Sequence, residues 1–167
     1  KVGDLYLQIH NRKEAVIYFE KVVDGYKSKN QYVKASLIYK NKMKNELGGQ
    51  TLLLEGWRSN KDAYNCLNNY FSNIKDTKIL KKEIDSIYAN DVTEQNRESF
   101  LQVIRHEYNK KNELSDSIKE MAYEIVAAQI PINPSIVTEL KGFNAKDNEL
   151  IKDILRFKVN KESKQKI

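Results

Sequence analysis

The fold is decided by the stretch KVGDLYLQIHNRKEAVIYFEKVVDGYK, which occupies residues 1–27. Apolar side chains recur in it at spacings of three and four residues, before and after the polar residues 11–13. This spacing places them along one face of a helix. The stretch therefore predicts the tail of one amphipathic helix up to about residue 10, a short turn, and a second helix over residues 14–26.

Small and aromatic residues occupy matching places in these two helices. Gly3 and Tyr6 lie on the first helix, and Ala15 and Phe19 lie on the second. Because Gly3 has no side chain, the second helix can approach closely, and Tyr6 then fills the gap that remains between the two. Over residues 2–27 this set resembles the tetratricopeptide repeat, a pair of helices that is used for binding.

A looser copy of the same pattern follows over residues 35–54. Ser36 and Tyr39 stand in the glycine and tyrosine places, and Gly48 and Leu52 stand in the alanine and phenylalanine places. Tyr39 follows the tyrosine of the first copy by 33 residues, which is close to the ~34-residue period of this repeat. The resemblance implies an all-α fold in which antiparallel helix pairs stack as a right-handed superhelix, or solenoid.

The first copy lacks the aromatic residue that normally opens this repeat, because that residue would lie before Lys1. We therefore expect a fragment of a longer tetratricopeptide-like protein. Its N-terminal edge carries the apolar Val2 and Leu5, whereas a terminal repeat usually carries a polar face. Self-association through this edge is the expected consequence.

Helical periodicity continues along the rest of the chain, and no alternating strand pattern occurs. A third helix is predicted from Tyr32 onward. The apolar faces of four later helices are predicted at these residues: Ala63, Cys66, Leu67, Tyr70 and Phe71; Ile79, Leu80, Ile84, Ile87 and Tyr88; Phe100, Leu101, Ile104 and Tyr108, with Val103 beside them; and Ile118, Met121, Ala122, Ile125 and Val126. The pair Gly48-Gly49 predicts a turn or a helix end. Further helix starts are predicted at residues that commonly cap helices: Ser59 with Asp62, residues 91–94, Ser115 or Ser117, Asn133 with Pro134, and Asn144. We expect repeats over residues 1–56, a less regular helical region packed on them over 57–159, and a basic, disordered tail over 160–167.

The chain of 167 residues has a formal net charge of +6, with 24 lysines and only 5 arginines. A basic balance is typical of proteins that bind polyanions. Lysine, asparagine, isoleucine and tyrosine also have AT-rich codons, so base composition alone can produce the same bias. No apolar run approaches the ~18 residues of a membrane span, and we expect a cytoplasmic protein without a membrane partner.

Residue patterns typical of enzymes and metal sites are missing. The chain has two histidines and one cysteine, too few for a usual zinc site, and it has no glycine-rich phosphate loop. We therefore expect no catalysis, no metal and no cofactor. Cys66 fits a core face better than a reactive thiol, Trp57 fits a core anchor better than an exposed hot spot, and His106 fits a solvated face.

In the tetratricopeptide family, ligands contact the inner face of the first helix of each repeat. The resemblance therefore implies a partner-binding site with these residues: Asp4, Leu7, Gln8, Leu37, Lys40 and Asn41. Family members that grip a peptide's free carboxylate have an asparagine where this chain has Asp4, and an aspartate there would repel that carboxylate. We expect a non-catalytic scaffold that binds a protein or peptide. The alternative is nucleic-acid binding by lysines and tyrosines of residues 26–29, 39–44 and the tail.

Overall fold

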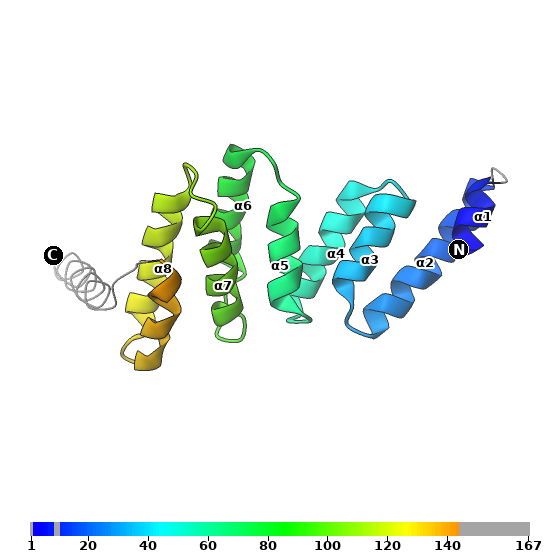
Figure 1. The fold of residues 1–167 in the computed structure, drawn as a ribbon. Helices are drawn as coiled ribbons and strands as arrows, with labels where there is room; N and C mark the ends of the chain where they lie inside the picture. Colours follow the sequence, from blue (N-terminus) through cyan, green and yellow to red (C-terminus); the bar gives the residue numbers. More distant parts are fainter. Residues whose placement is uncertain (1, 9–10, 144–167) are drawn as a thin grey trace. The chain divides into compact units, whose positions relative to one another are not determined.

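A computed structural model describes residues 2–8 and 11–143 of the chain. Within those residues every regular element is a helix and none is a strand, which confirms the all-α class (Figure 1). The α-helices are α1 (Val2–Gln8), α2 (Arg12–Ser28), α3 (Tyr32–Leu37), α4 (Glu46–Arg58), α5 (Ala63–Ser72), α6 (Thr77–Asn90), α7 (Arg97–Tyr108) and α8 (Ser115–Gln129). A π-helix, η1 (Ile38–Lys42), continues α3, and a 3-10 helix, η2 (Pro134–Gly142), follows α8.

The chain forms two compact units, Lys1–Asn96 and Arg97–Ile167. The sequence predicts a division after Gly56, but this residue lies inside α4, in the middle of the first unit. The expected helix after Asn144 and the expected tail over 160–167 fall outside the described residues.

In the first unit, each helix from α1 to α5 packs against the next one along the chain, and α3 also packs against α5. The approach of α1 to α2 is as close as the sequence predicts, because a Cβ atom added at Gly3 would overlap the ring of Phe19. Ala15 and Phe19 are buried. The side chain of Tyr6, the fourth member of the predicted set, lies outside the described part of the chain.

Gly48 and Gly49 do not end a helix, so that prediction is wrong. Both lie in the first turn of α4, where the Asn45 side chain caps the helix by accepting a hydrogen bond from the Gly48 N–H at 2.9 Å. A Cβ atom at Gly49 would lie 3.0 Å from the Ser36 carbonyl oxygen of α3. The absence of a side chain at Gly49 therefore serves the close packing of α3 on α4.

Ser59 and Asp62 do not form the predicted start of a helix. Ser59 closes α4, and its hydroxyl donates to the Glu55 carbonyl oxygen at 2.7 Å. Asp62 does precede α5, but its backbone is left-handed, with φ of 58°, and its side chain accepts from Asn65 Nδ2 instead of a backbone N–H. The turn is thus set by left-handed backbone, which the spacing of the two capping residues does not indicate.

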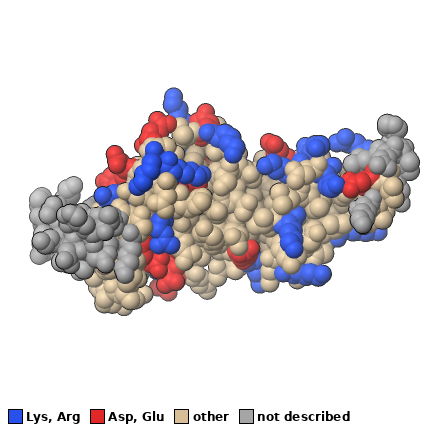
Figure 2. All heavy atoms as spheres, viewed as in Figure 1, with Lys and Arg blue, Asp and Glu red and all other residues tan. Residues whose placement is uncertain are grey.

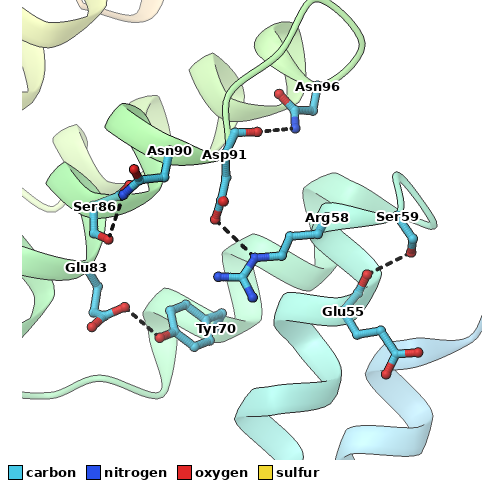
Figure 3. A network of polar contacts seen from close by, with 9 residues as sticks. All are labelled: Glu55, Arg58, Ser59, Tyr70, Glu83, Ser86, Asn90, Asp91 and Asn96. Atoms are coloured by element: carbon cyan, nitrogen blue, oxygen red, sulfur yellow. Dashed lines mark hydrogen bonds and ion pairs between the residues drawn. The ribbon is translucent and has the colours of Figure 1, made fainter.

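The predicted cap in residues 91–94 is also displaced. Asp91 closes α6, and α7 begins only at Arg97. The buried Asn96 holds the intervening loop from both sides, since its Oδ1 accepts from the Thr93 N–H at 2.7 Å and its Nδ2 donates to the Asp91 carbonyl oxygen at 2.9 Å. Figure 3 shows the second of these bonds. The side chain of this asparagine therefore satisfies backbone hydrogen-bonding groups of a loop, at the place where the sequence predicts the start of a helix.

Two polar contacts fasten α6 to the earlier helices of the first unit. Figure 3 shows the Tyr70 hydroxyl of α5 pointing at Glu83, to which it donates at 2.8 Å. In the same view Arg58 reaches from α4 to Asp91, with Nε 3.3 Å from Oδ2. The predicted apolar face of α6 is buried at Leu80, Ile84 and Ile87, whereas Ile79 is 53% exposed.

In the second unit, α7 and α8 bury the apolar faces that periodicity predicts for them. The buried members are Phe100, Leu101, Val103, Ile104, Ile118, Ala122, Ile125 and Val126. Neither Ser115 nor Ser117 caps α8 as predicted, because their hydroxyls donate to the carbonyl oxygens of Tyr108 and Leu114. Leu114 occupies the cap position instead, without a side-chain hydrogen bond to the helix.

Candidate functional site

The site begins with a local departure from α-helical geometry. The helix predicted from Tyr32 onward is regular only to Leu37, after which η1 begins and closes with a bond from the Met43 N–H to the Ile38 carbonyl oxygen at 3.1 Å. Such i to i+5 turns hold one extra residue, and they occur often at functional sites. The extra residue redirects the side chains that η1 carries.

Three polar side chains of η1 reach three different elements. The Tyr39 hydroxyl donates to Glu20 of α2, and Lys42 Nζ lies 2.9 Å from the Asp4 carboxylate of α1. Lys40 Nζ donates to Asn73 Oδ1, directly after α5, at 3.3 Å. η1 therefore links the first helix pair to α5.

Of the predicted binding residues, Asp4 forms an ion pair with Lys42 of the same chain. Its hydrogen bond to Lys42 lowers the pKa of its carboxyl group. The side chains of Leu7 and Gln8 lie outside the described part of the chain, and Asn41 is exposed on η1. Lys42, which the prediction does not include, therefore links Asp4 to η1, the element that carries the predicted residues Lys40 and Asn41.

Leu37 and Lys40, by contrast, line a hollow on the surface. It has a volume of about 90 Å³ and lies where α3, η1, α4 and α5 meet. The residues around it are Ser36, Leu37, Lys40, Glu46, Gly49, Gln50, Asn69 and Asn73. Two of the six predicted residues therefore fall in one concave site.

A second hollow, of about 260 Å³, lies beside the first between α3 and α5. It is lined by Asn30, Gln31, Val33, Lys34, Asp62, Asn65 and Asn69. Asn69 lines both hollows, and we refer to the two together as the α3–α5 groove. Each hollow is smaller than the ~300–1,000 Å³ usual for small-molecule sites.

Amide side chains dominate the α5 wall of this groove. Asn65 and Asn69 of α5 and Asn73, the residue directly after it, follow one another at four-residue spacing, which places them along one side of this helix and its C-terminal end. Gln50 of α4 accepts a hydrogen bond from Asn73 Nδ2 at 2.8 Å. We refer to the three asparagines as the asparagine row. Sequence reasoning did not predict the row, although the pattern N-x-x-x-N-x-x-x-N at the end of a predicted helix is a readable signal.

The other candidate residues take structural places. Trp57 and Cys66 are fully buried, as the core interpretation predicts, and burial raises the pKa of the Cys66 thiol to about 12. A protonated, inaccessible thiol is a poor nucleophile. His106 is exposed on α7. Across residues 2–8 and 11–143, no three His, Cys, Asp or Glu side chains gather as a metal ion would require.

Several lysines of the predicted nucleic-acid-binding stretches are held within the chain. Lys27 of α2 lies 3.1 Å from Glu55 of α4, and the hydrogen bond between them raises the pKa of the lysine. Lys42 is paired with Asp4 in the same way. On the face drawn in Figure 2, basic side chains over the first unit are dispersed among uncharged ones and form no continuous patch.

No helix in the described part of the chain is long and apolar enough to cross a membrane. Comparisons of the chain with protein-family models, with curated proteins and with solved structures found no match.

Proposed function

We propose that the unit Lys1–Asn96 is a non-catalytic interaction module that holds a polypeptide segment in the α3–α5 groove. The observation that carries the proposal is the groove itself, in which Leu37 and Lys40 line one hollow together with Asn69 and Asn73 of the asparagine row. Such a surface offers one exposed apolar side chain, charges of both signs and many amides. A non-obligate protein interface as a whole is about as apolar as the rest of a protein surface, and this groove is compatible with that.

The proposed module is of the tetratricopeptide type, with helix pairs stacked as a right-handed superhelix. In support, a small residue of the first helix meets the second helix in both pairs, Gly3 against Phe19 and Ser36 against Gly49. A crystal structure tests this directly. Superposing the pair α1–α2 on the pair α3–α4 should require a right-handed rotation, and a left-handed one would contradict the proposal.

Peptide binding is tested by selecting from a displayed library of random twelve-residue peptides with the full chain as bait. Enriched peptides should bind the unmodified chain and lose binding to Leu37→Glu, which places a charge in the groove. Ile79→Glu is the matched control, because Ile79 is 53% exposed on α6 and Leu37 is 45% exposed on α3. Equal binding by both variants would rule out the groove.

The same samples separate the nucleic-acid alternative. Phosphate contacts make binding fall steeply with salt concentration. Titration of labelled single- and double-stranded DNA and RNA at 50 and 150 mM salt should show no micromolar binding at the higher salt. Tight binding that persists there would replace the peptide proposal.

A further inference from the structure

The asparagine row suggests what part of a peptide the groove recognises. We propose that it binds the main chain of an extended peptide, largely independently of the peptide's sequence, by hydrogen bonds from Asn65 and Asn69 with support from Asn73. This inference rests on the proposed function, because it assumes that a polypeptide occupies the groove. It goes further by naming the atoms that are recognised.

The spacing of the row matches the repeat of an extended chain. Residues four apart on a helix are separated by about 6 Å along its axis. In an extended peptide, every second residue faces the same side, at intervals of about 6.6 Å. Successive asparagines of the row can therefore meet peptide groups at alternate residues, and from Asn65 to Asn73 the row spans about four peptide residues.

The hydrogen-bonding capacity of the row is only partly used. A carboxamide has two N–H donors and two acceptor lone pairs. Within the described residues, Asn65 Nδ2 donates once to Asp62 Oδ1 at 2.9 Å, and Asn69 Nδ2 donates once to the Asn65 carbonyl oxygen at 2.7 Å. Each of these amides thus keeps a donor and an acceptor, which match the C=O and N–H groups that a single residue of an extended peptide presents on the same side.

The side chain of Asn73 makes more hydrogen bonds within the chain than those of Asn65 and Asn69, and its role differs from theirs. Its Nδ2 donates to Gln50 Oε1 at 2.8 Å, and its Oδ1 accepts from Lys40 Nζ at 3.3 Å. These bonds fix the end of the row against α4 and η1. Asn73 therefore acts mainly as a positioning residue, and the extra residue of η1 is what brings Lys40 to it.

The charges of the groove balance, so they favour no particular peptide charge. Lys40 and Glu46 line one hollow, and Lys34 and Asp62 line the other. Among the described residues, apolar lining is limited to Val33 and Leu37. The groove therefore has little that could distinguish one peptide side chain from another. Binding is determined by the asparagine amides that face the peptide main chain, and we expect the bound peptides to share only a weak sequence consensus.

The test uses the peptides enriched from the random library, and it measures their affinity for the full chain by fluorescence anisotropy. N-methylation at every second residue blocks the main-chain N–H groups and should weaken binding at least about tenfold, the effect of losing about two hydrogen bonds. Replacing each peptide residue by alanine in turn should change affinity less than about threefold. Asn69→Ala should weaken binding about tenfold.

Asn90→Ala is the matched control for Asn69→Ala. Asn90 Nδ2 donates to the Ser86 carbonyl oxygen at 2.9 Å, the same four-residue bond that Asn69 makes, but Asn90 lies on α6 and outside the groove. Its replacement should leave affinity unchanged. Circular dichroism of both variants shows whether they keep their helices, and Asn65→Ala provides a second measurement if Asn69→Ala does not fold.

The possible results separate the two proposals. Peptides that lose binding to Leu37→Glu, tolerate N-methylation and depend on one or two side chains would overturn main-chain recognition and keep the peptide-binding module. A library from which no peptide binds the unmodified chain would overturn both. Loss on N-methylation together with loss in Asn69→Ala but not in Asn90→Ala supports the inference.

Discussion

The hydroxyl of Tyr39 in η1 donates to both carboxylate oxygens of Glu20 in α2, at distances of 3.0 and 2.9 Å. Tyr39 occupies the aromatic place of the second repeat-like copy, where the sequence suggests a gap-filling ring. The ring is only partly buried, and its hydroxyl provides a polar link to the preceding helix pair. The pKa of Tyr39 is raised to about 12, mainly by desolvation and to a smaller extent by the hydrogen bond to Glu20.

Tyr39→Phe should therefore destabilise the chain. Hydrogen bonds to charged groups contribute about 1.5–3 kcal/mol, and partial exposure of Glu20 reduces the expected loss to about 1 kcal/mol. Urea unfolding followed by circular dichroism measures it. Tyr64→Phe removes a hydroxyl from α5 as a control, and an equal loss in both variants would show that the bond to Glu20 contributes nothing.

Gly3→Ala and Gly25→Ala should change stability in opposite directions. A Cβ atom at Gly3 would overlap the Phe19 ring, whereas a Cβ atom at Gly25 in α2 meets nothing within 4 Å. Overpacking costs about 1–3 kcal/mol, and alanine in an open helix position contributes up to about 1 kcal/mol. Thermal unfolding of the two variants checks this, and stabilisation by Gly3→Ala would mean that α1 does not pack on Phe19.

Gly56→Ala should destabilise the chain through contacts between α4 and its neighbours. The added Cβ would lie 2.5 Å from Cys66 Sγ of α5 and 3.0 Å from Tyr32 Cβ of α3. We expect a loss of about 1–3 kcal/mol. Combining it with Cys66→Ala should recover part of the loss, because the sulfur is then gone. Strictly additive losses in the double variant would contradict the contact.

Stability should fall as the pH rises above about 9. The Cys66 thiol has an ordinary pKa of 9.0, which burial raises to about 12 in the folded chain. Between these values the unfolded chain releases a proton that the folded chain retains, so deprotonation favours unfolding. The contribution of this thiol is complete below pH 9 and is lost as the pH approaches 12.

Cys66→Ala isolates that contribution from those of other groups, including Tyr39. Free energies of unfolding measured from pH 7 to 11 should fall less steeply for Cys66→Ala than for the unmodified chain. Parallel curves would show that Cys66 titrates alike in the folded and unfolded states.

Helical periodicity predicts most of the apolar core. It identifies most of the buried residues of α5 to α8, with the exposed Ile79 as an exception, because a face repeats over several turns and tolerates local errors. Helix ends are predicted poorly at Gly48, Ser59 and residues 91–94. At each of these places a feature that the capping pattern does not contain decides the outcome: the Ser36 carbonyl oxygen beside Gly49, the left-handed backbone of Asp62, or the two bonds of Asn96.

The candidate site is predictable only in part for a similar reason. Family resemblance points to Leu37 and Lys40, which do line the α3–α5 groove. It gives no guidance to α5, which lies beyond both copies of the repeat pattern. Nor can composition indicate η1, since a π-helix has no distinctive residue pattern and is stabilised by the tertiary contacts of Tyr39, Lys40 and Lys42.

The extra residue of η1 makes the number of residues in this segment critical. Deleting one residue between Ile38 and Lys42 would allow ordinary α-helical bonding and would rotate the preceding helix by about 100° relative to the helices after it. The link to Glu20, the link to Asp4 and the approach to Asn73 could not then all be kept. Single-residue deletions here should consequently be far more harmful than substitutions at the same positions, and length variation should be tolerated better at the solvent-exposed turn of Lys29 and Asn30.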